Sequence, residues 1–104
     1  MSFVVELSLS AEDDLVRLFE FLLECADSTE DLDRAQLAID AIRATAQHRL
    51  AITPFSFRKA AQNPAQRELI IPFEATGYVA LHEIVSTSKV VVLAVRHQRE
   101  EDYH

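Results

Sequence analysis

The first half of the chain alternates hydrophobic and polar positions in a way that predicts one strand followed by a helix. Residues 3–9 are rich in β-formers and alternate apolar with polar after Val5, which predicts a strand with one solvated face. Ser10 can cap the next helix and acidic residues follow it, so the helix is expected to begin at about Ala11. Its apolar positions recur at spacings of four and three: Ala11, Leu15, Leu18, Leu22 and Cys25.

A second helix follows with the same rhythm. The segment Asp27-Ser28-Thr29 interrupts the first pattern and supplies a new cap. The pattern then ends at Thr53-Pro54, because the residue before a proline is pushed out of the helical region. Its apolar stripe is Leu32, Ala35, Ile39, Ile42, Ala46 and Leu50. The two segments predict a helical hairpin, with the lone Cys25 as a buried packing residue.

The second half predicts strands after an irregular connection over residues 55–66. A strand is expected from Arg67 to Phe73, with Pro72 at a sheet edge or a bulge because proline lacks a ladder donor. Residues 74–77 contain the only glycine and predict a turn. Two further strands, Tyr78 to Ser86 and Lys89 to His97, are joined by the short link Thr87-Ser88, which is typical of a tight hairpin.

The grouping of these elements predicts the fold class. Val90 to Val95 lacks alternation, so this strand is expected to be central and covered on both faces. Strands and helices occur in the order β-α-α-β-β-β instead of alternating, which indicates an α+β fold with a helical hairpin packed on an antiparallel sheet. A length of 104 residues predicts a single domain, residues 1–104.

Charge changes this picture because it is segregated along the chain. The net charge is −7, but residues 1–33 hold ten acids and one base, residues 34–99 hold nine bases and four acids, and residues 100–104 hold three acids. Only the middle and C-terminal part is therefore expected to meet an anionic partner. The longest apolar run, Val90 to Val95, is too short to span a membrane, and no secretory signal is evident at the N-terminus, so a cytoplasmic protein is expected.

Candidate chemistry is sparse. One glycine and one cysteine exclude glycine-rich phosphate loops and cysteine-rich zinc sites, and the four histidines lack H-x-x-x-H spacing, so neither a metal nor a cofactor is expected. His82 alternates with Leu81 and Glu83, which predicts a solvated or partner-facing strand face. The run Arg96-His97-Gln98-Arg99 turns polar directly after an apolar strand and is the best candidate for an exposed site.

Three C-terminal blocks resemble the ParE branch of the RelE/ParE toxin superfamily. They are Arg67-Glu68-Leu69-Ile70-Ile71-Pro72-Phe73, then Gly77-Tyr78-Val79-Ala80-Leu81-His82-Glu83-Ile84, then the run from Val92 to Tyr103. The opening Leu9-Ser10-Ala11-Glu12-Asp13-Asp14-Leu15 is similar to the family's entry into its first helix. This resemblance implies a helical hairpin on an antiparallel sheet, in agreement with the order expected from periodicity.

The resemblance also implies a function. A toxin of this branch is neutralised by a cognate, ParD-like antitoxin and poisons DNA gyrase by binding, without catalytic residues and without direct sequence-specific contact to nucleic acid. The target-binding residues are then expected to be Arg96, His97, Arg99 and Tyr103. An antitoxin segment with apolar anchors and acidic residues, forming a hetero-oligomer, is expected to meet Arg58, Lys59, Arg67 and Arg96.

Two alternatives stay open. In the RelE branch the same fold cleaves messenger RNA on the ribosome, and the roles of base, phosphate binder and proton donor would fall to Arg67, Arg96, His97 and Tyr103. The chain has only two lysines, Lys59 and Lys89, and an acidic tail, which favours the gyrase-directed hypothesis over the nuclease. The second alternative is a non-toxic member that only binds its antitoxin.

Overall fold

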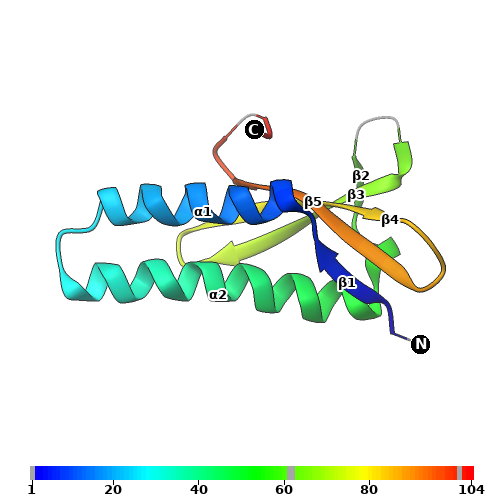
Figure 1. Ribbon diagram of the computed structural model, residues 1–104, viewed down its shortest axis with the longest axis horizontal. Helices are drawn as coiled ribbons and strands as arrows, with labels where there is room; N and C mark the ends of the chain where they lie inside the picture. The colour runs from blue at the N-terminus through cyan, green and yellow to red at the C-terminus, as the bar shows by residue number, and fades with distance from the viewer. Residues whose placement is uncertain (1, 61–62, 101) are drawn as a thin grey trace.

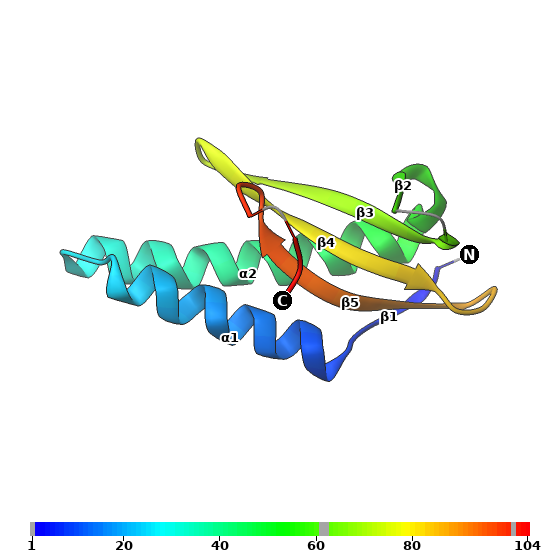
Figure 2. The same ribbon diagram turned by 90° about the horizontal axis from the view of Figure 1, so that it is seen from above.

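The computed structural model describes residues 2–60, 63–100 and 102–104. Two helices lie side by side across one face of a curved five-stranded sheet with strand order β1-β5-β4-β3-β2 (Figures 1 and 2). The closed end of the hairpin extends beyond the sheet, which makes the molecule elongated at 44 × 27 × 25 Å. The elements are β1 (Val4–Leu7), α1 (Leu9–Glu24), α2 (Thr29–Ile52), the 3-10 helix η1 (Pro54–Ser56), β2 (Arg58–Ala60), β3 (Asn63–Phe73), β4 (Thr76–Ile84) and β5 (Lys89–His97).

The predicted α+β class and the helical hairpin on a sheet are confirmed, with two differences in the strands. The sheet is mixed, because β1 pairs with β5 in parallel whereas all other pairs are antiparallel. The connection predicted to be irregular over residues 55–66 instead contains η1, β2 and the start of β3, while its residues 61–62 lie outside the described part of the chain. These short elements have no sustained period of their own and are stabilised by pairing with a neighbour, such as Lys59 opposite Arg67.

The start of α1 differs from the prediction for a tertiary reason. The cap is Ser8 and not Ser10, and the helix begins at Leu9. The Ser8 hydroxyl oxygen accepts a hydrogen bond from the Ala11 amide at 3.1 Å and donates one to the Leu93 carbonyl at 3.0 Å. The second bond spans distant parts of the chain, so local sequence could not show which serine was the cap.

The second helix starts and ends where predicted. The Ser28 hydroxyl accepts from the Asp31 amide at 3.1 Å, and Thr53 ends the helix before Pro54. The prediction for Cys25 was wrong: it caps the C-terminal end of α1 and its side chain is exposed. The apolar spacing in the sequence continues to Cys25, but α1 ends at Glu24. Its C-terminal end extends past the sheet, so none of the described strands covers Cys25.

Strand β5 is central, as predicted, but only one of its faces is fully covered. Val90, Val92 and Val95 are buried beneath the helices, whereas Val91 and Leu93 are half-buried. An irregularity in the pairing with β4 leaves Leu93 as an extra residue. β1 pairs with β5 only as far as Val92. Beyond Val92, α1 lies along this edge of β5.

The β3–β4 and β4–β5 connections also differ in detail. Pro72 lies on the stretch of β3 that β2 does not pair with, which confirms the predicted edge position. The turn is Glu74–Ala75, with Glu74 at a φ of 54°, and Gly77 already belongs to β4. A Cβ on Gly77 would lie 2.7 Å from the Ile71 carbonyl oxygen, so close packing requires the glycine. The link between β4 and β5 is residues 85–88, longer than the predicted two-residue turn.

Candidate functional site

The described part of the C-terminal tail, residues 98–100 and 102–104, folds back and is held by side chains of β3, β5 and α1. The Tyr103 hydroxyl donates to a Glu68 carboxylate oxygen at 2.5 Å, and the Arg96 guanidinium lies 5.1 Å from the Tyr103 ring centre. Arg96 also donates to the Glu100 carbonyl at 2.6 Å. Arg17 of α1 forms an ion pair with the Glu100 carboxylate at 2.8 Å. These contacts give the tail a defined position against the sheet.

The surroundings of Tyr103 and Glu100 fix the protonation state of each side chain. Burial and the hydrogen bond to Glu68 raise the pKa of the Tyr103 hydroxyl well above its ordinary value, so it stays a neutral donor. Burial acts to raise the pKa of Glu100, but the hydrogen bond and charge of Arg17 outweigh it, and the net shift is downward. Glu100 is therefore ionised at neutral pH and keeps its pairing with Arg17.

His97 lies on the opposite face of the sheet from Arg96. Neighbouring residues of a strand point to opposite faces, and His97 packs its ring edge-on against Tyr78 at 5.4 Å, on the side of the helices. Its Nδ1 accepts from the Arg99 amide at 3.0 Å, so the remaining proton is on Nε2, which donates to the Thr76 hydroxyl at 2.9 Å. Both ring nitrogens are thus occupied by the protein itself.

A cleft of about 480 Å³ opens beside this histidine, between α1 and the end of β5. We call it the tail cleft; it is lined by Arg17, Leu18, Phe21, Leu22, His97, Arg99 and Glu100. Phe21 is 60% exposed and adds a large apolar surface to the cleft wall. The tail cleft combines an apolar wall with the exposed Arg99 on its rim.

The basic residues predicted to meet an antitoxin mostly have partners inside the protein. Arg58 pairs with Glu68 at 3.0 Å, and Arg67 donates to the Phe57 carbonyl at 3.1 Å. Arg96 is 12% exposed and is covered by the tail. Lys59 lies on β2 beside Arg67, with an exposed side chain. The four residues are dispersed over both sheet faces and do not form one basic surface.

The four residues considered for RNA cleavage are likewise not brought together. Arg67 and His97 are on the helix side of the sheet, whereas Arg96 is on the outer side with Tyr103 packed over it. The partners of Arg67 and His97 on β4 are His82 and Tyr78, four residues apart, a separation of roughly 13 Å. This arrangement does not place a base, a phosphate binder and a proton donor around one point.

The prediction of a solvated His82 was wrong. Its side chain is 0% exposed, with Nε2 donating to the Pro54 carbonyl at 3.1 Å and the ring packed edge-on against Phe57. Burial lowers its pKa, and the positive charge of Arg67 acts in the same direction. The short η1 turn covers this end of the sheet, and the alternation of β4 alone could not reveal that cover.

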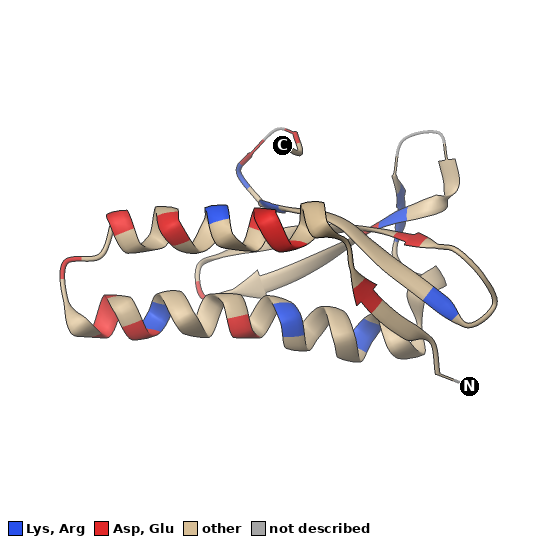
Figure 3. Cartoon of the chain, viewed as in Figure 1, with Lys and Arg blue, Asp and Glu red and all other residues tan. Residues whose placement is uncertain are grey.

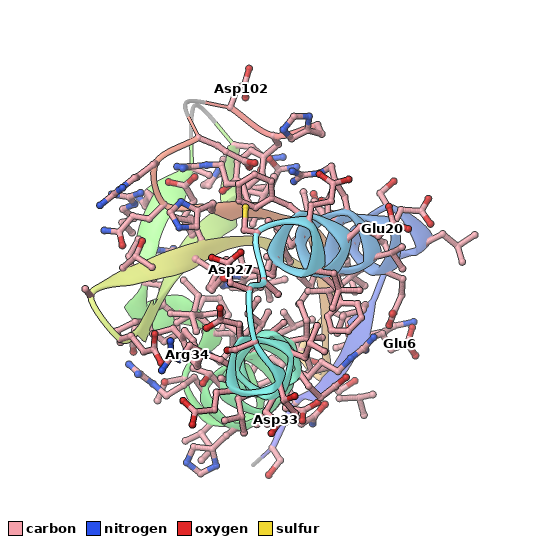
Figure 4. All side chains as sticks on the ribbon, turned by 90° about the vertical axis from the view of Figure 1, so that its left-hand side faces the viewer. Glu6, Glu20, Asp27, Asp33, Arg34 and Asp102 are labelled. Atoms are coloured by element: carbon pink, nitrogen blue, oxygen red, sulfur yellow. The ribbon has the colours of Figure 1, made fainter. Side chains whose placement is uncertain are left out.

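A second hollow, missed by the sequence reasoning, lies between the two helices on the side away from the tail cleft. We call it the hairpin groove; it measures about 350 Å³ and is lined by Leu15, Val16, Phe19, Glu20, Leu23, Gln36, Ile39 and Arg43. Val16 is 56% and Leu23 37% exposed. Figure 4 shows the hairpin end-on, with Glu20 on its outer side. The signal in the sequence was the surplus of apolar positions on α1 beyond a single stripe.

Charged residues are distributed unevenly around the hairpin groove. Acidic side chains are spread along both helices, and Figure 3 shows red positions on each of them. Arg43 closes the groove by a two-bond contact with Glu12, at 2.7 and 2.9 Å. That hydrogen bond is the main cause of the lowered pKa of Glu12. The pair neutralises one acid, while Asp13 and Glu20 stay exposed nearby.

Across residues 2–60, 63–100 and 102–104, no group of three or more His, Cys, Asp or Glu side chains is arranged to hold a metal ion. Neither of the two described α-helices is long and apolar enough to cross a membrane.

Comparison with known proteins places the chain in a family. A comparison with curated proteins finds no match. Among solved structures, a chain of the chromosomal ParDE TA system from P. aeruginosa superimposes with a TM-score of 0.69, over 92% of this chain and 96% of that one, at 12% sequence identity. Identity this low shows a shared fold. The family model described as ParE toxin of type II toxin-antitoxin system, parDE, matches residues 5–102, nearly the whole chain, and the protein therefore belongs to the ParE toxin family.

Proposed function

We propose that the chain is the toxin of a type II toxin-antitoxin pair, that a cognate antitoxin neutralises it, and that it acts in the cytoplasm by binding and poisoning DNA gyrase. The observation that carries the proposal is the family match over residues 5–102. The target surface is the tail cleft together with the tail that borders it, where Phe21 and Arg99 are exposed. An exposed aromatic residue beside a cation is typical of a binding hot spot.

The geometry supports binding over catalysis. An endonuclease needs its proton-transfer groups within reach of one scissile bond. Here His97 and Tyr103 belong to opposite sides of the sheet, and each already has a hydrogen-bond partner in the protein. A Tyr103 hydroxyl with a raised pKa is also a poor proton donor near neutral pH. A gyrase poison requires only a complementary surface.

Inducible expression of the chain without an antitoxin tests the proposal. A gyrase poison produces DNA damage and filamentation, and the purified protein traps cleaved DNA in a supercoiling assay with gyrase. A rapid stop in translation with cleavage of ribosome-bound messenger would instead assign the RelE-type activity. Unimpaired growth with folded protein present would remove both toxin hypotheses and leave the non-toxic, antitoxin-binding member.

Two substitutions test the target surface without disturbing the core. Arg99→Glu and Phe21→Ser alter side chains that are already exposed, so both variants should fold normally while gyrase poisoning falls about tenfold or more. Leu37→Ser on α2 is the matched control, because Leu37 is equally exposed at 60% and does not line the tail cleft. Full toxicity of both cleft variants would place the target surface elsewhere.

A further inference from the structure

The middle of the chain, residues 41–67, carries positive charge and no negative charge. Five of the ten basic residues of the protein, and none of its seventeen acidic residues, fall in this range. Two of these bases are paired with acids from other elements, Arg43 with Glu12 and Arg58 with Glu68. The other three form no ion pair with any described carboxylate: Arg49, Lys59 and Arg67. They give a protein of net charge −7 one locally cationic region.

The three cations surround two aromatic rings at the end of the molecule away from the closed end of the helical hairpin. The Arg49 guanidinium, near the end of α2, lies 5.1 Å from the Phe57 ring centre. The Arg67 guanidinium, on β3, lies 6.0 Å from the Phe55 ring centre, and Lys59 on β2 is opposite Arg67. Figure 3 shows blue positions on α2, β2 and β3 at this end. We call these residues the cation-aromatic surface: Arg49, Phe55, Phe57, Lys59 and Arg67.

Lys59 and Arg67 form a like-charge pair across two strands. Directly opposite residues of antiparallel strands point to the same face with their Cβ atoms about 5 Å apart, and like charges placed there are destabilising. Arg67 donates to the Phe57 carbonyl at 3.1 Å, which does not neutralise its charge, and the Lys59 side chain is exposed. An anion bound between the two side chains would remove their repulsion. The pair is therefore better suited to a protein with an anionic ligand than to the free chain.

Phe55 adds a second kind of contact to this surface. It belongs to η1 and is 58% exposed, although its ring is held by neighbours. Phe3 packs edge-on against it with ring centres 6.0 Å apart, and Arg67 lies beside the ring. An aromatic ring with a defined position and much of its surface in water can stack on another flat group.

We propose that the cation-aromatic surface binds single-stranded nucleic acid, with backbone phosphates at Arg49, Lys59 and Arg67 and one unpaired base stacked on Phe55. Cations that follow the backbone, combined with an aromatic side chain that stacks on a base, are the means by which proteins hold single strands without reading their sequence. The inference goes beyond the proposed function, because this contact needs neither gyrase nor an antitoxin. A toxin that traps cleaved DNA would gain from it a contact with the DNA itself.

Other occupants satisfy only part of the surface. An acidic protein segment, including the acidic hairpin of a second copy, neutralises the cations, but its carboxylates meet the negative face of the Phe55 ring unfavourably. A nucleic-acid duplex supplies phosphates, but its bases are stacked on one another and are not free to stack on the ring. The net charge of −7 opposes long-range attraction, so the contact should be confined to a few nucleotides.

Fluorescence anisotropy of the full chain with a labelled oligothymidylate of about ten nucleotides tests the proposal. The logarithm of the affinity should fall with the logarithm of the salt concentration with a slope of about −2, or roughly 0.7 for each of the three phosphates. Lys59→Gln should weaken binding about fivefold and reduce the slope by about 0.7. Phe55→Ser should weaken binding about tenfold without changing the slope, because it removes stacking and no charge.

Matched controls separate this site from general effects. Lys89→Gln makes the same charge change on β5, where Lys89 is already paired with Glu6 at 3.0 Å. Leu37→Ser removes a side chain of similar exposure, 60%, from α2 outside the surface. Both should bind within about twofold of the wild type. Phe55→Trp should bind at least as tightly as the wild type, because tryptophan also stacks on bases, which distinguishes stacking from a structural role of the ring.

Three results would overturn the inference while leaving the toxin-antitoxin proposal in place. The first is no saturable binding in about 0.05 M NaCl with up to about 0.1 mM protein. The second is binding that neither Lys59→Gln nor Phe55→Ser weakens, which would place the site elsewhere. The third is polyglutamate that binds as tightly as the oligonucleotide, which would make the surface a site for acidic peptides.

Two further ligands define which nucleic acid is bound. A duplex of the same length should bind about fivefold more weakly than the single strand, and a duplex that bound more tightly would contradict stacking on Phe55. A single RNA strand of matching sequence should lose affinity in the same variants as the DNA strand, because both present phosphates and an unpaired base. The strand that binds more tightly identifies the source of the natural ligand.

Discussion

Asp14 shows how one side chain can complete the edge of a sheet. It is buried on α1, and its carboxylate accepts a hydrogen bond from the Val95 amide at 2.8 Å, where β1 no longer pairs with β5. Arg17 lies 3.9 Å from the other carboxylate oxygen. A buried amide without an acceptor is costly, so Asp14 performs on β5 the role that an additional strand would have there.

Replacing Asp14 is therefore expected to destabilise the fold more than replacing its exposed neighbour. Asp14→Ala should lower the free energy of unfolding by about 1 to 3 kcal/mol, because it leaves the Val95 amide buried without a partner. Asp13→Ala is the control and should change it by less than about 0.5 kcal/mol. Urea unfolding followed by circular dichroism measures both; equal values would show that the Asp14 contact adds nothing.

His82 is expected to make stability depend on pH. Burial keeps its folded-state pKa below the unfolded value of about 6.5, so the unfolded state binds more protons and stability rises with pH. Stability should be complete above about pH 6.5 and decline as the pH falls towards the folded pKa. His82→Leu should flatten this dependence between about pH 7 and pH 5, as urea titrations at several pH values would reveal. An unchanged slope would point to other groups.

At the scale of the elements, the polar C-terminal tail contributes more contacts to the fold than its composition indicated. Because the polar run from Arg96 to Arg99 was predicted to be exposed, the residues after it would be expected to contribute little to the stability of the fold. In the structure the tail partners Arg17, Glu68 and Arg96, so its removal leaves partly buried charges without their contacts. If such a deletion abolished toxicity, the cause could be either the missing target surface or the reduced stability of the fold.

Deleting residues 98–104 should therefore lower the free energy of unfolding by about 2 to 4 kcal/mol. Deleting only His104 is the control, because its contact with Glu100 is long, at 3.7 Å, and exposed. Thermal and urea unfolding would compare the two. A deletion variant as stable as the wild type would mean that the tail contacts are energetically neutral, and the toxicity result could then be interpreted directly.

At the scale of the whole molecule, the acidic hairpin and the more basic remainder of the chain present different surfaces on the two sides of α1. Residues 1–33 alone contain ten of the seventeen acids. The hairpin groove is mainly apolar and has Glu20 and Arg43 among its lining residues, whereas the tail cleft is lined by the charged residues Arg17, Arg99 and Glu100 beside its apolar wall. A partner that wraps around α1 would meet a different charge pattern on each side.

Binding of the antitoxin should accordingly stabilise the toxin in a salt-dependent way. At a free antitoxin concentration about 100 times Kd, the stabilisation is about 2.7 kcal/mol, which raises Tm by about 10 °C or more in a domain of this size. The increase should shrink at high salt, because part of the affinity is electrostatic. Differential scanning fluorimetry of the chain with and without antitoxin measures it; a salt-independent increase would indicate apolar binding alone.

The sequence by itself determined the elements whose signals are local. The apolar spacing of α2, its Ser28 cap and its end at Thr53 follow from backbone and side-chain preferences within a few residues, and the strand Lys89–His97 was predicted with its observed bounds. The helical hairpin and the α+β class followed from these patterns. The sequence placed residues 96–99 at the end of β5, where the structure has them. It did not show on which face of the sheet each of their side chains lies.

Only the tertiary structure decided the features that depend on contacts between distant residues. Ser8 replaced Ser10 as the cap because it also reaches Leu93, and His82 became buried because η1 covers it. Arg96 and His97 were separated onto two faces by the alternation of β5, and the hairpin groove exists only where α1 meets α2. Periodicity reports which positions are apolar, whereas the element that covers each position is set by packing across the whole chain.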